Sequence, residues 1–345
     1  MHKVDIIILS WDRSDDTLAA IESACGQTEI DLQVYVVDQN SAPEHVARVQ
    51  RACDAYENVT LCLNDRNLGC PGGRNLATSL GQGDYIVALD NDAVFADRTV
   101  CARAAAEMHR RTSLGALAFR IERHDRADPD ESSWAYYPLM ANSDADSVFA
   151  AMSFVGAGHM LRRSAFEQVG AYDDWLFFMN EELDLSHRMI SAGYEIEYRR
   201  DLVVQHKVTS ERRMSWSAQR FEYFVRNLLY VKLKVYGFGY RTLEEALVLF
   251  VGGIRAGNVC AACRGLWAGF AAQGKAHRAR RANPYYHVSP AFAAYRSRVA
   301  QADPLDFAES VWPDRNRLYR LYAMLRWQTN FAGMRDPKTE KGDPK

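Results

Sequence analysis

The sequence predicts an α/β protein in which a mostly parallel sheet is flanked by helices and followed by a helical C-terminal region. Two observations support this prediction. Apolar runs of strand length alternate with helical segments over residues 1–95, a rhythm typical of parallel strands joined by right-handed crossovers. From about Ser215 the chain instead shows long amphipathic segments, 220–237 and 241–257, whose spacing of apolar residues favours helices.

The strands of the first half are short apolar runs that end in polar residues. Residues 4–10 are almost continuously apolar, as expected for a strand buried on both faces of a sheet. Ser14 then opens a helix as its expected N-cap. Further strands are expected at 31–38, 58–65 and 85–92, and further helices at 43–55 and from the glycine-rich segment 67–81 onward. Because ligands bind beyond the carboxyl ends of such strands, the polar residues there mark the expected site.

The middle of the chain has a less regular pattern. Residues 124–137 are polar, contain a turn at Pro129 and are expected to form a loop. A short strand and a helix are expected within 153–174, an acidic helix ending at Gly193 and a strand within 175–199, and a last strand at 202–208. The expected domain boundary lies at 214, with helices over 215–335 and a charged, disordered tail at 336–345.

Composition narrows the class of protein. The 345 residues are 48% hydrophobic and 25% charged, as in globular chains, and the net charge of −2 disfavours nucleic acid as a partner. No apolar run reaches the roughly 18 residues of a membrane span, so we expect a cytoplasmic protein. Seven scattered cysteines argue against a disulfide framework. Cys260 and Cys263 lack a second pair of zinc ligands nearby, so small buried residues are the favoured interpretation.

The segment GDYIVALDND, residues 83–92, is the most informative part of the chain. It reads as a buried strand that ends in Asp90 and Asp92, where unpaired charge would be costly to bury. Carboxylate oxygens suit Mg²⁺ or Mn²⁺ carried by a nucleoside diphosphate. The alternative is that Asp92 is the N-cap of a following helix.

Arg74 is the second informative residue. It lies in the first turn of the helix that follows the glycine-rich segment, where a cation gains nothing from the helix dipole. Its position is explained if it meets a phosphate or a carboxylate. The glycine spacing matches neither a dinucleotide-binding motif nor a P-loop.

The order of these motifs resembles glycosyltransferase family 2, a family with the GT-A fold, and in particular its bacterial rhamnosyltransferase-like members. The resemblance starts with Asp38 after the second strand, N-L-G-x-x-x-x-R-N at 67–75 and DND at 90–92. It continues through FVGAGHMLRRSAFEQVGAYDD, the acidic helix within FFMNEELDLSHRMISAGYEIEY, and His206 after the last strand. It covers residues 3–240 in unbroken order.

The resemblance implies that residues 1–95 bind the nucleotide sugar and 96–214 form the acceptor side. The donor-binding residues it implies are Ser10, Trp11, Asp38, Asn67, Arg74, Asp90 and Asn91. Asp38 would hydrogen-bond the nucleobase, and Arg74 would lie near the diphosphate. Asp92 and a neutral His206 would ligate Mg²⁺ or Mn²⁺. Lys207, Arg212 and Arg213 could close over the diphosphate, or could form a solvated basic loop.

The same resemblance places the chemistry on the acidic helix. The position of the family's catalytic base falls on Glu182, where the family usually has Asp, and Glu181 is the alternative base. Asp184 is expected to have a structural role instead. Gly158 falls in the acceptor-side segment, and Trp175 could stack on a sugar ring. Phe177 and Phe178 could do the same or could belong to the core.

The resulting prediction is a metal-dependent inverting glycosyltransferase, with a UDP- or dTDP-sugar as favoured donor. The acceptor would be a hydroxyl of a glycan, a lipid-linked sugar or a small metabolite. The alternatives are a sugar nucleotidyltransferase and a non-catalytic sugar-nucleotide-binding protein. The basic run at 275–281 could touch an anionic membrane or a lipid diphosphate, and a solvated helix end is an equal alternative.

Overall fold

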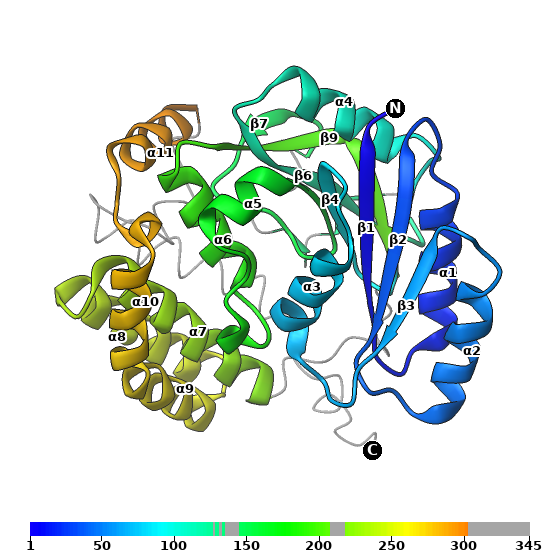
Figure 1. Ribbon diagram of the computed structural model, residues 1–345. Coiled ribbons are helices and arrows are strands. Elements are labelled where there is room, and N and C mark those ends of the chain that lie inside the picture. The colour runs from blue at the N-terminus through cyan, green and yellow to red at the C-terminus, as the bar shows by residue number, and fades with distance from the viewer. Residues whose placement is uncertain (127, 131–132, 135–144, 208–217, 303–345) are drawn as a thin grey trace, which may run out of the picture. The chain divides into compact units, whose positions relative to one another are not determined.

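The computed structural model describes residues 1–302 except 127, 131–132, 135–144 and 208–217. These residues form two compact units, one of residues 1–207 with 288–302 and one of residues 218–287. The first unit is built on a nine-stranded sheet with the order β3-β2-β1-β4-β8-β6-β9-β5, and β7 pairs with β9 (Figure 1). The predicted α/β fold class is confirmed.

The first four strands pair in parallel, as the sequence predicts. They are β1 (Lys3–Ser10), β2 (Asp31–Asp38), β3 (Val59–Leu63) and β4 (Tyr85–Leu89), joined by α1 (Ser14–Cys25), α2 (Pro43–Cys53) and α3 (Gly69–Leu80). All five residues of β4 are buried, which explains its unbroken apolar sequence. Ser14 is not the N-cap of α1, because Arg13 takes that position and the Ser14 hydroxyl bonds to His45 Nδ1 at 2.9 Å.

The second half of the sheet contains elements that sequence periodicity did not predict. They include the short strand β5 (Ala93–Phe95), the helix α4 (Val100–Arg110), the strand β6 (Leu114–Arg123) and the edge strand β7 (Val148–Ala150). Because β5 follows Asp92 directly, the alternative in which Asp92 caps a helix is wrong. The strand β8 (Gly158–Arg162) runs antiparallel between β4 and β6.

The last strand is longer than predicted. The two strands expected within 175–208 form one strand, β9 (Glu195–His206), which pairs in parallel with β6. It follows α5 (Arg163–Val169), the 3-10 turn η2 (Asp174–Leu176) and the acidic helix α6 (Glu181–Ser191). Among the described residues, six of the nine strands therefore share one direction, and β5, β7 and β8 oppose them.

The second unit is helical over its described residues. It contains α7 (Ala218–Tyr236), α8 (Tyr240–Arg255), α9 (Val259–Ala271), α10 (Gln273–Ala282) and the 3-10 turn η3 (Pro284–Tyr286). The following helix α11 (Pro290–Ala302) belongs to the first unit, where Tyr295 Oη donates to the Ile196 carbonyl of β9 at 2.6 Å. No described helix combines the length and the apolar character that crossing a bilayer requires. The predicted tail, 336–345, lies outside the described residues.

Candidate functional site

The candidate site lies at the carboxyl end of the parallel strands. Ser10 and Asp38 end β1 and β2 at paired positions, and Asp90 directly follows β4. Pairing of β5 with β9 then places Ala93 opposite His206, and the Lys207 amide donates to the Asp92 carbonyl at 2.7 Å. Residues more than a hundred positions apart thus meet at one edge of the sheet.

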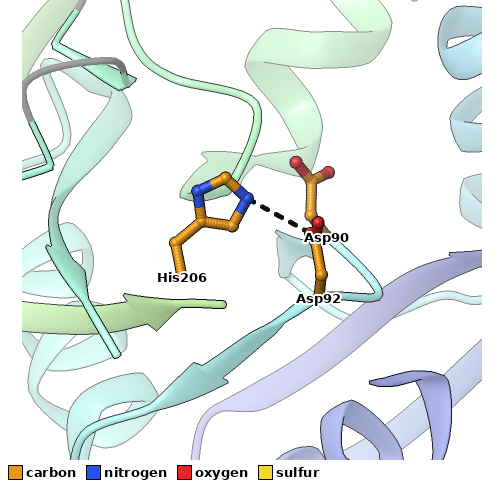
Figure 2. A group of neighbouring side chains, drawn as sticks. All are labelled: Asp90, Asp92 and His206. Atoms are coloured by element: carbon orange, nitrogen blue, oxygen red, sulfur yellow. Dashed lines mark ion pairs between the residues drawn. The ribbon is translucent and has the colours of Figure 1, made fainter. Parts of the chain in front are cut away.

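Three of these residues form a potential metal centre. Asp90, Asp92 and His206 each offer one ligand atom, and these atoms lie within 4.8 Å of one another. Figure 2 shows the three side chains gathered together, with His206 Nε2 3.2 Å from Asp92 Oδ1. Two carboxylates and one imidazole are a donor set that suits Mn²⁺ and leaves coordination positions for substrate oxygens. The residues present therefore fit a divalent cation.

Asp130 supports this centre from behind, and sequence reasoning did not find it. Its carboxylate is buried, and Oδ2 lies 3.1 Å from His206 Nδ1. Such a contact would hold the Nδ1 proton and direct Nε2 toward a cation bound beside Asp92. Burial lowers the pKa of His206, but hydrogen bonds to Asp130 and Asp92 outweigh it and raise the pKa to about 10. Without a cation the ring is therefore protonated, contrary to the expected neutral form, and it must release the Nε2 proton to ligate a metal. Asp130 falls in a polar loop 76 residues before His206, so no local pattern links them.

Arg13 occupies the other side of Asp92. Its Nη1 lies 2.7 Å from Asp92 Oδ2, and its Nη2 lies 3.0 Å from Asp16. Burial raises the pKa of Asp92, but the hydrogen bond with His206 and the charge of Arg13 outweigh it and lower the pKa to about 2. The sequence signal that could have found Arg13 is a cation just past the carboxyl end of the first strand.

Arg74 joins the metal centre to the acidic helix α6. Its side chain is only 4% exposed, and its guanidinium lies 3.2 Å from Asp90, 2.8 Å from Glu182 and 3.4 Å from Glu181. A further bond runs to the Gly156 carbonyl at 3.2 Å. Of the two partners predicted for Arg74, carboxylates are therefore the ones observed, and contact with a diphosphate stays a prediction.

The two glutamates at the start of α6 differ in environment. Glu181 has a buried side chain, and burial together with the charge of Glu182 raises its pKa to about 8. Glu182 is 16% exposed and makes the shorter contact with Arg74. A carboxylate that is partly exposed and held by an arginine is better placed to accept a proton from a substrate than a buried carboxyl group with a raised pKa.

Strained backbone and a buried ion pair fix the start of α6. Phe177, Met179 and Asn180 all have positive φ angles, between 61° and 73°, a conformation that costs non-glycine residues about 1–3 kcal/mol each. The Phe177 carbonyl is held by the Cys70 amide of α3 at 2.8 Å. Within α6, Asp184 bonds to Arg188 at 2.9 Å, and both are buried. Asp184 thus has a structural environment.

Two glycines of the predicted acceptor segment have different surroundings. Gly158 is in β8, where an added Cβ would meet Val204 Cγ2 at 2.9 Å, so its neighbours belong to the sheet core. At Gly156 an added Cβ would lie 2.5 Å from Glu182 Oε1 and 2.9 Å from Arg74 Nη2. Gly156, which sequence reasoning missed, is the glycine beside the acidic helix, and the acceptor role of Gly158 stays a prediction.

The residues expected to bind the nucleotide are distributed along the same edge. Asp38 is buried, and its two oxygens accept from the Ser41 amide at 2.9 Å and hydroxyl at 2.6 Å. Ser10 is buried and its carbonyl accepts from the Gln39 amide, whereas Trp11 is 52% exposed. Asn67 Oδ1 accepts from Gly69, and Asn91 lies 3.4 Å from Thr17 Oγ1. Their nucleotide contacts stay predictions.

The remaining predicted residues are only partly placed. Trp175 lies half-buried in η2, and Phe177 and Phe178 are half-buried too, so neither phenylalanine is fully in the core. Lys207 Nζ lies 3.9 Å from Asp16 Oδ1, close to Arg13. Arg212 and Arg213 lie outside the described residues. Cys260 and Cys263 are both exposed, so the interpretation of them as small buried residues is wrong.

Comparison with known sequences agrees with this geometry. Residues 5–170 match the family model described as glycosyl transferase family 2. The O-antigen chain rhamnosyltransferase WbaN of Salmonella anatum is 23% identical over 192 residues, covering 52% of this chain and 58% of the relative. A β-1,3-glucosyltransferase of Escherichia coli, WfaP, which uses UDP-Glc and an α-D-GlcNAc-diphosphoundecaprenol acceptor, is 29% identical over 92 residues, 27% of this chain and 36% of its own. The matches thus span at most about three fifths of these two relatives.

Solved structures support the fold. The mannosyltransferase PcManGT from Pyrobaculum calidifontis, in complex with GDP-Man and Mn²⁺, has a TM-score of 0.57 at 17% identity, covering 99% of this chain and 88% of its own. GalNAc-T7 with UDP, GalNAc and Mn²⁺ has a TM-score of 0.63 at 13% identity, covering 87% of this chain and 57% of its own. The predicted GT-A fold is therefore confirmed.

Proposed function

We propose that this chain, a glycosyltransferase whose residues 5–170 form a glycosyltransferase family 2 domain, transfers a sugar with inversion from a nucleoside-diphosphate donor to a hydroxyl. The observation that carries the proposal is the position of Arg74. Its guanidinium contacts Asp90 on the donor side and Glu182 on α6. The Arg74 guanidinium thus connects a carboxylate of the potential metal centre, Asp90, to the carboxylate that could act as the base, Glu182.

The donor end requires a cation. Asp92 and His206 would hold Mg²⁺ or Mn²⁺, with Asp90 beside it, and Asp130 would keep His206 in the right orientation. When bound, the cation would neutralise charge that develops on the departing diphosphate. The presence of Mn²⁺ in the structures of PcManGT and GalNAc-T7 supports this assignment.

The acceptor end requires a base, which we assign to Glu182. The acceptor hydroxyl oxygen forms a bond to the anomeric carbon, the bond between that carbon and the diphosphate oxygen breaks, and the hydroxyl proton passes to Glu182. Arg74 holds the Glu182 carboxylate in place, since its Nη1 lies 2.8 Å from that group. Holding both reactants in line contributes much of the rate.

Donor selection would involve the strand ends. Ser10, Trp11 and Asp38 would surround the nucleobase, with the exposed Trp11 ring offering a stacking surface. Asn67, Asn91 and Arg74 would lie toward the ribose and diphosphate, and Lys207 with Arg212 would close over the phosphates. A UDP- or dTDP-sugar remains the favoured donor class.

The acceptor would be a growing glycan, a lipid-linked sugar or a small metabolite at the inner face of a membrane or in the cytoplasm. The relatives from Salmonella and Escherichia coli, whose names specify O-antigen and lipid-diphosphate substrates, support the first two classes. Trp175 and the backbone around Gly156 and Gly158 would line the acceptor side.

A thermal-shift panel of nucleotide sugars, with and without Mn²⁺, tests the proposal. We expect one nucleotide sugar to stabilise the protein only with Mn²⁺, and Asp92→Ala to abolish that shift. Transfer assays on the best donor should release a nucleoside diphosphate. Release of pyrophosphate would instead show nucleotidyl transfer, and binding without turnover on any glycan or lipid-linked acceptor would show a sugar-nucleotide-binding protein.

A further inference from the structure

The helix α8 presents two apolar stripes within the second unit. Ala246, Leu249 and Gly253 form a buried stripe, and an added Cβ on Gly253 would meet Ala262 of α9 at 2.4 Å. Leu243, Leu247 and Ile254 form a second stripe on a different face of the helix and are 50%, 63% and 52% exposed. A globular helix normally needs one apolar stripe, so the second is available for a partner.

The helix α9 continues this exposed surface. Its buried face contains Ala261, Ala262, Gly265 and Gly269. The opposite face carries Cys260, Cys263 and Trp267 at spacings of three and four residues, and all three are exposed. Trp267 is 76% exposed, and together with the exposed residues of α8 it adds to an apolar surface of the kind that marks an interaction site.

Aromatic residues connect the two helices at one end of this surface. Phe238, which precedes α8, is 58% exposed and contacts the Phe270 ring of α9 with centroids 6.2 Å apart. Tyr240 opens α8 and is 66% exposed. Since Trp267 lies one turn before Phe270, the exposed aromatic residues of α8 and α9 gather at this end.

Positive charge lies next to the same end. The helix α10 has no acidic residue, and Lys275, His277, Arg278 and Arg281 are exposed along it. Arg280 of α10 donates to the carbonyls of Lys234 and Val235 in the last turn of α7. Phe238 follows shortly after the end of α7. Figure 1 shows α8, α9 and α10 packed around α7 in this unit.

We propose that this surface, formed by Phe238, Tyr240, Leu243, Leu247, Ile254 and Trp267 with the cations of α10, is a docking site for an anionic lipid bilayer. Apolar side chains with a tryptophan enter the boundary between headgroups and acyl chains, and Lys and Arg pair with anionic headgroups. The cations of α10 favour an anionic partner over a second copy of the same basic surface. The inference uses no residue of the candidate active site and does not rest on the proposed sugar transfer.

Co-sedimentation of the full chain with vesicles tests this proposal. We expect binding to vesicles of phosphatidylcholine with phosphatidylglycerol, weak binding to pure phosphatidylcholine, and loss of binding in high salt. Lys275→Gln with Arg278→Gln should lower the partition coefficient about tenfold or more, since each cation near an anionic surface is worth about 1 kcal/mol. Leu247→Ser with Trp267→Ala should lower it by a similar factor.

Matched controls alter exposed residues elsewhere. Leu63→Ser in β3 changes an apolar residue that is 53% exposed, and Arg51→Gln in α2 changes an exposed cation, both in the first unit. Vesicle binding should not change in either variant. Circular dichroism and thermal unfolding check that each variant folds. Equal binding by the surface variants and these controls would overturn the proposal.

The two exposed cysteines give a second readout that needs no substitution. Cys260 and Cys263 lie on the proposed surface, so peptide mapping after maleimide treatment should show rapid labelling without vesicles and protection with anionic vesicles. Labelling that is slow without vesicles would mean that another part of the chain covers the surface. Protection that grows with protein concentration alone would mean that a second copy covers it. Either result would refute lipid docking.

Discussion

Arg13 and the metal centre share one carboxylate. Arg13 Nη1 lies 2.7 Å from Asp92 Oδ2, while the other oxygen, Oδ1, lies 3.2 Å from His206 Nε2. A cation bound by Asp92 and His206 would compete with the Arg13 guanidinium for the same negative charge. We therefore expect Arg13 to oppose metal binding in the absence of donor.

Replacing Arg13 with alanine should strengthen Mn²⁺ binding in the absence of donor. We expect about a fivefold gain in affinity, which corresponds to about 1 kcal/mol for a partly exposed ion pair. Calorimetric titration with Mn²⁺ measures it. Arg48→Ala is the matched control, because Arg48 pairs with Asp15 on the neighbouring surface and not with Asp92. Unchanged or weaker binding by Arg13→Ala would show that Arg13 supports the centre.

Replacing Asp130 with alanine should weaken Mn²⁺ binding about 10- to 100-fold, as the loss of an orienting carboxylate behind a histidine ligand usually does. The reason is that His206 Nδ1 loses its partner at 3.1 Å and the ring is free to turn. Asp130→Asn, which keeps a carbonyl acceptor, should restore part of the affinity. Asp128→Ala, an exposed acid in the same loop, should bind Mn²⁺ normally. Equal affinities for all three variants would leave Asp130 without a role in the centre.

Replacing Gly156 with alanine should reduce sugar transfer while the protein remains folded. The new methyl group would lie 2.5 Å from Glu182 Oε1 and 2.9 Å from Arg74 Nη2, so both side chains would have to move. A shift of about 1 Å in a catalytic group can cost about 10²-fold in rate. Gly239→Ala, where an added Cβ meets nothing within 4 Å, is the control. Normal kcat in Gly156→Ala would contradict the position we assign to Glu182.

The parts of the fold that the sequence predicted depend on local pattern. The first four strands are apolar runs closed by turns, and in β1 and β4 burial on both faces of the sheet requires such runs. The sequence did not predict β6, and it predicted two strands in place of β9, because both strands contain charged residues. Arg120 pairs with Glu122 at 2.7 Å and Arg199 with Asp201 at 2.9 Å, and these ion pairs hide strand periodicity.

The site residues likewise divide into those that a sequence pattern predicts and those that depend on contacts between distant parts of the chain. Asp90 and Asp92 stand out because two acids end a buried strand, and His206 because its order along the chain fits a family pattern. Asp130 and Arg13 act through partners 76 and 79 residues away, and no local pattern encodes such contacts. Cys260 and Cys263 share a helix face by spacing alone, but which face of α9 is covered depends on its neighbours.

The buried Glu181 should make stability depend on pH. Burial raises its pKa from 4.5 to about 8, so the folded state holds a proton that the unfolded state releases between these values. The contribution of Glu181 to the free energy of unfolding is fully present below pH 4.5 and is lost as the pH rises to about 8. Glu181→Gln should therefore flatten the fall of the free energy of unfolding across this window, measured by urea denaturation. An identical slope in wild type and variant would mean that Glu181 ionises normally.

Glu182→Gln should remove sugar transfer and leave donor binding unchanged. Glutamine keeps the shape of the side chain and can still accept a hydrogen bond from Arg74, but it cannot take a proton from the acceptor hydroxyl. Loss of a positioned general base lowers the rate about 10²- to 10⁴-fold, so kcat should fall by that factor while the Mn²⁺-dependent thermal shift with donor persists. Glu181→Gln is the matched variant on the same turn of α6, and because Glu181 is buried and mostly neutral below pH 8, it should keep most of its activity at pH 7. If Glu181→Gln loses transfer and Glu182→Gln retains it, the base is Glu181.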